Sequence, residues 1–115
     1  MNKYDYVTKT MQIMDFEHNT KHAHEDYMYV QENKLVTRQE AFDDLKEYFE
    51  EGNKILSSKL LFEDEDLLAW KEMVRGSDGK KYRVTNVQIW RDGKAWREMV
   101  SHVEVLKMSI LVKSK

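Results

Sequence analysis

The spacing of apolar residues changes character once along this chain, close to Gly52 and Asn53. Before that point apolar residues recur at steps of three and four, which is typical of amphipathic helices. After it they form short runs separated by turns rich in Gly and Asp, which indicates strands. Helices that precede a series of strands, instead of alternating with them, favour an α+β fold. We therefore expect two or three N-terminal helices packed on a long, curved antiparallel sheet.

The first segment predicts a helix from about residue 3 to residue 18. Its apolar stripe ends in a polar residue and consists of Tyr4, Val7, Met11, Met14 and His18. The polar stretch 18–26 fits either a short second helix or a turn. Residues 27–36 favour a strand pair around Glu32 and Asn33, because the aromatic and β-branched residues on either side suit a pleated surface.

A capping box predicts the start of the clearest helix. Thr37 is followed three residues later by Glu40, so each side chain can bond a free backbone N–H at a helix start. The helix should span about 38–51, with Gly52 at the left-handed position after its end. We expect Asp43, Asp44 and Lys46 to face outward, and Ala41, Phe42, Leu45, Tyr48 and Phe49 to face the core.

Turn signals divide the rest of the chain into four predicted strands. The acidic cluster 63–66, the stretch 76–79 with its two glycines, and Asp92-Gly93 supply the turns. Asp-Gly is a strong signal for a two-residue hairpin. The predicted strands are 54–62, 67–75, 81–91 and 94–112, the last being either one long strand or a strand with a loose tail.

Composition excludes several kinds of site. The 115 residues include no cysteine, which removes disulfides, thiolate nucleophiles and Cys-type zinc sites. A net charge of −2 disfavours nucleic-acid binding, because phosphate affinity comes from clustered Lys and Arg. No apolar run approaches the ~20 residues of a membrane helix, and no signal-peptide core is present. We expect one domain over residues 1–115, a cytoplasmic location, no cofactor, and neither nucleic acid nor membrane as a partner.

The order of elements, together with the strand, turn and strand from Gln88 to Glu98, resembles the nuclear transport factor 2-like superfamily. The resemblance is to its SnoaL-like and ketosteroid-isomerase-like members in particular, and it spans nearly the whole chain. It implies a cone in which a curved sheet wraps around helices and leaves a pocket. It also implies pairing into homodimers through the outer sheet face. The superfamily includes isomerases, cyclases, hydrolases and dehydratases, and members that only bind, so fold does not settle function.

A pocket on a curved sheet is lined by alternate residues, so one of two sets faces it. The resemblance favours a set that mixes aromatic walls with convergent polar groups. Its members are Leu68, Trp70, Glu72, Val74, Val84, Asn86, Gln88, Trp90, Glu98, Val100 and His102. The opposite set is about as apolar and would instead form a sheet-to-sheet interface. Its members are Lys71, Met73, Val87, Ile89, Met99 and Val103.

Three residues of the first set are candidate catalytic groups. A Glu in a partly apolar pocket has a raised pKa through desolvation and can move protons near neutral pH. Glu72 and Glu98 would fill this role with His102 as their partner, while Asn86 and Gln88 would orient the ligand. The alternative interpretation leaves Glu72 and Glu98 in cross-strand ion pairs with no further role.

The pattern departs from the ketosteroid isomerases at both of their key carboxylates. Asn86 stands where the resemblance implies the oxyanion-stabilising aspartic acid, and it can donate a hydrogen bond but not a proton. The position of the family's base falls near Val30 or Gln31, neither of which can act as one, with Glu32 beside them. Steroid isomerisation by the family's mechanism is therefore not predicted.

Further ligand contacts are predicted at the walls and mouth of the pocket. Val100 is one predicted wall contact. The rings that could stack on an aromatic ligand, although such rings are more often core or dimer contacts, are Trp70, Trp90, Trp96, Tyr4, Tyr29 and Tyr82. His18 and Asp26 could lie at the pocket mouth. The spacing of His18 and His22 resembles a metal pair, but Asn19 replaces the Glu of the zinc-protease motif, and we predict no metal site.

The sequence thus supports two functional hypotheses. The first is a pocket protein that binds a small apolar or aromatic molecule, with an acid-base isomerase, cyclase, dehydratase or hydrolase activity as its finer form. The second is a non-catalytic homodimeric interaction or ligand-carrier module. They differ in whether the polar set surrounds a cavity or the interior is filled by side chains.

Overall fold

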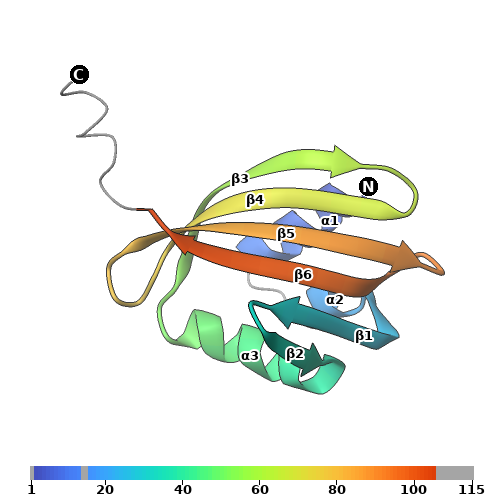
Figure 1. Ribbon diagram of the computed structural model, residues 1–115, viewed down its shortest axis with the longest axis horizontal. Coiled ribbons are helices and arrows are strands. Elements are labelled where there is room, and N and C mark those ends of the chain that lie inside the picture. Colours follow the sequence, from blue (N-terminus) through green and yellow to red (C-terminus); the bar gives the residue numbers. More distant parts are fainter. Residues whose placement is uncertain (1, 14–15, 106–115) are drawn as a thin grey trace.

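A six-stranded sheet and three helices make up the part of the chain that the computed structural model describes, residues 2–13 and 16–105 without the side chains of Phe16 and Asn19. The helices lie on one side of the curved sheet (Figure 1). In chain order the elements are α1 (Lys3–Gln12), α2 (Phe16–Thr20), β1 (Ala23–Gln31), β2 (Lys34–Thr37), α3 (Arg38–Glu50), β3 (Lys54–Glu63), β4 (Leu67–Arg75), β5 (Lys81–Arg91) and β6 (Lys94–Glu104).

The sheet is mixed, so the expectation of a wholly antiparallel sheet was wrong. Its strand order is β2-β1-β6-β5-β4-β3, and β1 runs parallel to β6 while every other neighbouring pair is antiparallel. Parallel neighbours need a long connection between them. Here β2, α3 and the strands β3 to β5 make up that connection, and they carry the chain around the sheet before β6 pairs with β1.

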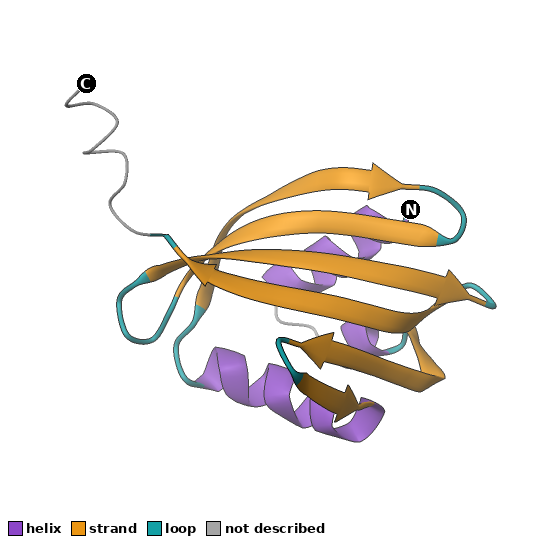
Figure 2. Cartoon of the chain, in the orientation of Figure 1, coloured by secondary structure: helices purple, strands orange, loops and turns teal. Residues whose placement is uncertain are grey.

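The helices cover the concave face of the sheet and form the core with it (Figure 2). Irregular register within β3 and between β5 and β6 accompanies the bend of the sheet, as bulges increase local twist. The core joins residues of α1, β1, β2, α3, β4 and the β5–β6 hairpin. Its buried members are Val7, Ala23, Tyr27, Val36, Ala41, Leu68, Trp70, Trp90 and Ala95. The expected α+β arrangement of helices under a curved sheet is confirmed.

The capping box at the start of α3 is confirmed. The Thr37 hydroxyl accepts from the Glu40 backbone N–H, and the Glu40 carboxylate accepts from the Thr37 backbone N–H. The helix ends at Glu50, and Gly52 follows with φ +97°, the left-handed conformation expected there. Strands β4 and β5 have the predicted bounds, β3 is one residue longer, and the strand pair around Glu32 is present.

The N-terminal helix is shorter than predicted. It ends at Gln12 with Ile13 as its C-cap, and α2 begins at Phe16, so one helix over 3–18 was wrong; Met14 lies outside the described residues. After α2 the chain enters β1 beside β6, where the Ala95 N–H donates to the His22 carbonyl at 2.7 Å. The last strand ends at Glu104, and the rest of the predicted stretch to 112 lies almost entirely outside the described residues.

None of the described helices has the length and apolar character that crossing a membrane would require.

Loss of the Thr37 cap should destabilise the protein measurably. Thr37→Ala removes the side-chain acceptor of a free helix N–H, so the free energy of unfolding should fall by about 1 kcal/mol. Thr37→Ser keeps the hydroxyl and is the matched control, and its capping contribution should be preserved because Ser caps helices at least as well as Thr. Urea denaturation followed by circular dichroism measures both, and equal losses in the two variants would contradict the role of the cap.

Candidate functional site

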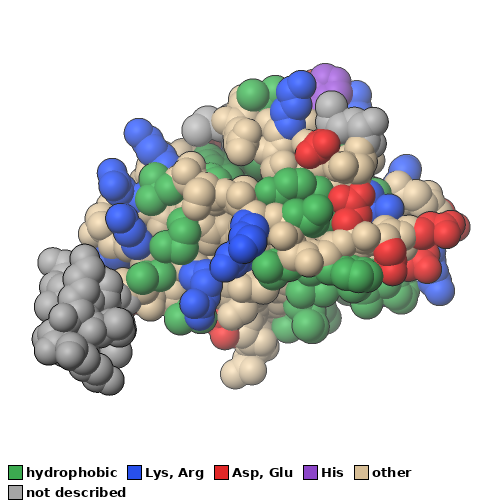
Figure 3. Space-filling model, turned by 90° about the horizontal axis from the view of Figure 1, so that it is seen from above, with side chains coloured by type: hydrophobic (Ala, Val, Ile, Leu, Met, Phe, Trp, Pro, Cys, Tyr) green, Lys and Arg blue, Asp and Glu red, His purple; other side chains and the backbone are tan. Residues whose placement is uncertain are grey.

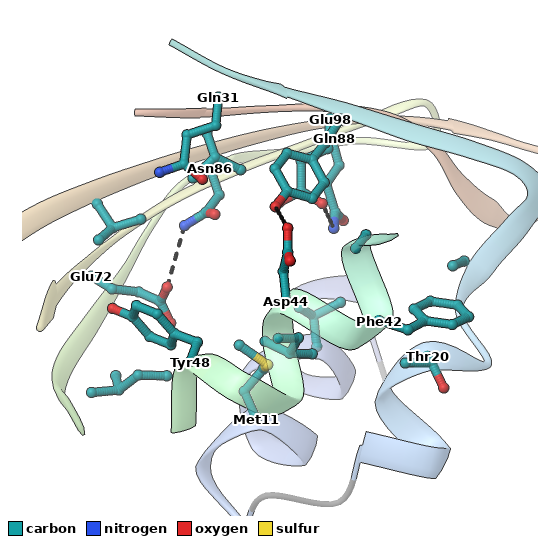
Figure 4. A pocket seen from close by; sticks show the side chains of 18 of the residues that line it. Met11, Thr20, Gln31, Phe42, Asp44, Tyr48, Glu72, Asn86, Gln88 and Glu98 are labelled. Atoms are coloured by element: carbon teal, nitrogen blue, oxygen red, sulfur yellow. Dashed lines mark hydrogen bonds between the residues drawn. The ribbon is translucent and has the colours of Figure 1, made fainter. Parts of the chain in front are cut away.

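A cavity of about 260 Å³ lies between the concave face of the sheet and the helices. Strands β4, β5, β6 and β1 form its roof, and α3 and α1 form its floor with residues such as Leu45 and Met11. Figure 4 shows polar side chains from both sides reaching into this hollow. The wall is mostly apolar and carries a small number of polar groups, as binding pockets usually do.

All members of the strand set favoured by the resemblance except Leu68 and Trp90 line the cavity. Along β4 and β5 buried residues alternate with more exposed ones, which is the pattern of strands with one covered face. The lining residues contributed by β4, β5 and β6 are Trp70, Glu72, Val74, Val84, Asn86, Gln88, Glu98, Val100 and His102. Members of the opposite set point away from the helices, and Ile89, Met99 and Val103 are exposed.

Glu72 is a carboxylic acid buried in the roof of the cavity. Only 7% of its surface is exposed, and the Asn86 side-chain amide donates to its Oε1 at 3.3 Å. Desolvation by burial raises the pKa of Glu72 to about 7, against the smaller opposing effect of neighbouring hydrogen-bond donors. The Trp70 indole N–H also lies near this carboxyl, yet it makes no hydrogen bond of normal geometry with any described residue.

Glu98 lies in a different hydrogen-bonding environment from Glu72. The Tyr27 hydroxyl donates to its Oε1 at 2.6 Å, and the Gln88 amide donates to the same oxygen at 2.9 Å. The residue is partly exposed as a whole, but its carboxyl is enclosed, and desolvation raises its pKa although both hydrogen bonds oppose the shift. The Trp90 indole N–H donates in turn to the side-chain oxygen of Gln88 at 3.0 Å. Glu98, Gln88 and Trp90 therefore belong to one hydrogen-bonded network.

His102 lines the same cavity from β6. Its Nδ1 lies 3.0 Å from the side-chain nitrogen of Gln31, so the Gln31 amide donates to a neutral imidazole. Desolvation lowers the pKa of His102, and the nearby Glu32 only partly offsets this effect. The imidazole is therefore uncharged near neutral pH.

Three predicted contacts lie outside the cavity lining. Trp90 is buried but packs on His22, with ring centroids 5.9 Å apart, beside a second hollow at the end of the sheet. Asp26 is exposed because it neighbours the inward-facing Tyr27, and successive strand residues point to opposite faces. His18 is exposed in α2, and its backbone carbonyl accepts from the Tyr6 hydroxyl. The cavity lining thus includes neither His18 nor Asp26, and their place at the pocket mouth stays a prediction.

Several lining residues were not predicted as site residues. Tyr27 and Gln31 lie at two-residue steps from the predicted Tyr29 on β1, and all three line the cavity. That alternation was the available signal. Asp44 was predicted to face outward, but it lines the cavity between Ala41 and Tyr48, which are three and four residues away on the same helix face. The Tyr29 hydroxyl donates to Asp44 Oδ2 at 3.5 Å.

The described residues include no group of three or more His, Asp and Glu side chains placed to hold a metal ion.

Comparison with known proteins identifies the fold. No protein-family model matches the chain, and no curated protein matches its sequence. A "putative ketosteroid isomerase" from Kribbella flavida matches with TM-score 0.77 and 17% identity, over 90% of this chain and 76% of that one. A nuclear transport factor 2-like protein of unknown function from Cytophaga hutchinsonii matches with TM-score 0.70 and 12% identity, over 93% and 88%.

A de novo designed protein with a curved β-sheet is also similar, with TM-score 0.65 and 15% identity over 99% of this chain and 96% of the design. The chain therefore has the nuclear transport factor 2-like fold that the sequence predicted. These similarities are at 17% identity or less and show the fold alone, so the argument for function must come from the pocket.

The raised pKa of Glu72 should make stability depend on pH in a defined direction. A carboxyl whose pKa is about 7 when folded and near its ordinary value of 4.5 when unfolded favours the folded state below about pH 4.5. That contribution is lost as the pH rises to about 7. Glu72→Gln removes it, so the stability of the variant relative to wild type should increase by on the order of 3 kcal/mol between about pH 4 and pH 8.

Urea denaturation of both proteins at the two pH values measures this difference. The variant keeps the shape and an acceptor oxygen for Asn86, so other titrating groups cancel in the comparison. A difference between the proteins that stays constant from about pH 4 to pH 8 would show that Glu72 titrates normally.

Proposed function

We propose that the protein binds a small, largely apolar or aromatic organic molecule under the curved sheet and performs an acid-base step on it. One observation carries the proposal. The buried carboxyl of Glu72 lies in the wall of a cavity of about 260 Å³, and its pKa is raised to about 7. A group that titrates near the working pH is both a competent base and a competent acid. Perturbed carboxyls of this kind cluster at functional sites.

The other polar groups of the pocket suit supporting roles. Asn86 donates to Glu72 and would hold its carboxyl in one orientation. Tyr27 and Gln88 hold Glu98, which would serve as a second proton-exchanging group, in a fixed position. Neutral His102 can accept or donate a proton at either ring nitrogen, so it would act as a partner in proton transfer.

The similarity to a protein described as a ketosteroid isomerase supports the class of chemistry and not its detail. The resemblance implies the isomerase base near Val30 or Gln31; of the two, only Gln31 lines the cavity, and an amide cannot take up a proton in that role. In this proposal the base is instead Glu72, which lies on β4. We propose isomerisation, cyclisation, dehydration or hydrolysis of a non-steroid ligand as the reaction class.

A simple test uses 5-nitrobenzisoxazole, a neutral two-ring probe of carboxylate bases. The base removes the ring C–H proton, the N–O bond breaks, and a nitrile and a coloured phenolate form. We expect saturable turnover whose kcat/KM rises from about pH 6 to about pH 8, because only ionised Glu72 accepts the proton. Glu72→Gln should lower the rate by about a hundredfold or more.

Glu104→Gln is the matched control, because Glu104 is an exposed residue of β6 that pairs with Lys80 and lies outside the cavity lining. Its rate should equal that of the wild type. Turnover that survives in Glu72→Gln, or that shows no dependence on pH in this range, would remove Glu72 from the proposed role.

A second candidate function is homodimerisation through the outer sheet face. One register position on that face is apolar in all six strands. The residues of this row, in sheet order, are Leu35, Val30, Met99, Val87, Ala69 and Phe62. Exposed hydrophobic residues also gather on the edge strand β3, and the view from above shows hydrophobic side chains interspersed with Lys and Arg (Figure 3). Contiguous apolar surface of this kind is typical of interfaces.

The dimer proposal predicts the sedimentation behaviour of the protein. Wild type should sediment as a dimer at micromolar concentration, and Met99→Glu should sediment as a monomer, because a self-complementary interface buries the new charge twice. Met99 is 62% exposed, so the substitution leaves the core intact. Lys46→Glu, on the exposed face of α3, is the control and should remain dimeric. A wild-type monomer contradicts the proposal.

A further inference from the structure

We propose that the ligand of this pocket is an organic amine that is protonated at neutral pH and carries a one- or two-ring apolar or aromatic body. This inference rests on the proposed ligand-binding function and adds the charge and size of the ligand to it. Three features of the described lining residues carry it: the sign of the charged groups, the weak hydrogen bonding of two carboxyls, and the aromatic walls.

The charged groups in the lining are all acidic. Asp44, Glu72 and Glu98 contribute three carboxyls, and the described lining residues include no Lys or Arg. The Arg38 guanidinium stacks on the Phe42 ring, 4.4 Å from its centroid, and is not part of the lining. His102 adds no positive charge, because burial lowers its pKa. An anionic ligand would find no opposite charge here, whereas a cation would meet three potential counter-charges.

Two of the carboxyls have only long hydrogen bonds from their protein donors. Asn86 donates to Glu72 at 3.3 Å and Tyr29 donates to Asp44 at 3.5 Å, both beyond the usual ranges for such donors. Glu98, by contrast, receives hydrogen bonds of 2.6 and 2.9 Å at its Oε1, both of ordinary length. Figure 4 shows Glu72 from β4 and Asp44 from α3 reaching into the same hollow. An ammonium group has three donors and could supply the shorter bonds that these carboxyls lack.

The aromatic walls suit the same ligand. Rings of Tyr27, Tyr29, Tyr48 and Trp70 line the cavity, and the faces of such rings attract cations. The Trp70 indole N–H has no partner of normal geometry, and only 4% of the residue is exposed. Ionised Glu72, stabilised by a bound cation, is the better acceptor for this neighbouring N–H. The volume of about 260 Å³ is small for a binding pocket, which restricts the body to one or two rings.

Binding of an amine should be linked to the release of a proton from the protein. The titratable groups that line the cavity with Glu72 include Glu98, which raises the pKa of Glu72, Tyr48, whose own pKa Glu72 raises, and also Asp44 and His102. None of these groups supplies a positive charge that would favour the ionised carboxylate. A cation beside Glu72 favours the ionised carboxylate instead. Because the pKa of free Glu72 is about 7, the affinity for the amine should rise about tenfold from about pH 6 to about pH 8.

The experiment is isothermal titration calorimetry of the full chain with three matched probes: 2-naphthylmethylamine, 2-naphthylmethanol and 2-naphthoate. Titrations in two buffers of different ionisation enthalpy give the number of protons exchanged. We expect the amine to bind at least tenfold more tightly than the alcohol, to release protons near pH 7, and to bind more tightly as the pH rises. The carboxylate probe should bind most weakly.

Variants locate the effect. Glu72→Gln and Asp44→Asn should each lose most of the preference for the amine while their affinity for the alcohol stays within about twofold, which also shows that they fold. Asp43→Asn is the control, because Asp43 is an exposed neighbour on the same helix and accepts from Gln39 at 3.1 Å. It should keep the full preference.

The outcomes separate this inference from the function on which it rests. If the alcohol binds as tightly as the amine, or if amine binding takes up protons, the charge assignment is overturned while ligand binding stands. Equal preference for the amine in Glu72→Gln, Asp44→Asn and wild type also overturns it, because the selectivity then arises elsewhere. If none of the three probes binds, both the inference and the proposed ligand-binding function fall.

Discussion

The pairing of β1 with β6 is the constraint on which the pocket depends. The register sets Tyr29 opposite Glu98 and Gln31 opposite Val100, so the inward side of β1 lies directly beside the inward side of β6. This contact brings the Tyr27 hydroxyl to Glu98 and the Gln31 amide to His102, across about seventy residues of sequence. Without this pairing the four-stranded remainder would present its polar groups to solvent, and their pKa values would return toward ordinary ones.

Much of the fold follows from local signals in the sequence. The capping box at Thr37, the Asp92-Gly93 turn and the alternation within β4 and β5 are local, and each predicted its element to within a residue or two. The parallel neighbour of β6 could not be predicted in this way, because strand partners distant in sequence leave no mark on local spacing. The end of α1 at Gln12 was missed because the apolar stripe of the sequence continues at helical spacing beyond it.

The candidate site was partly predictable for the same reasons. Inward-facing strand residues such as Glu72 and Gln88 follow from parity once a face is chosen, and the resemblance favoured the face that lines the cavity. Asp44 did not follow, because a charged residue on an amphipathic helix is ordinarily solvated, and only the tertiary structure brings it under the sheet. The carboxyl of Glu72 is buried with one long hydrogen bond, and burying a polar group in this way costs stability. Sites that depart from the rules of stable folding in this way are where function is expected.

The outer apolar row and the inner polar groups occupy consecutive positions on the same strands. Met99 follows Glu98, and Val87 lies between Asn86 and Gln88, so each backbone segment has one side chain toward the pocket and the next toward solvent. The curvature of such a segment is therefore shared by both faces. Any association that flattened or tightened the convex side would alter the spacing of the groups beneath it. Thermodynamic reciprocity then requires that filling the hollow change the strength of that association by the same factor.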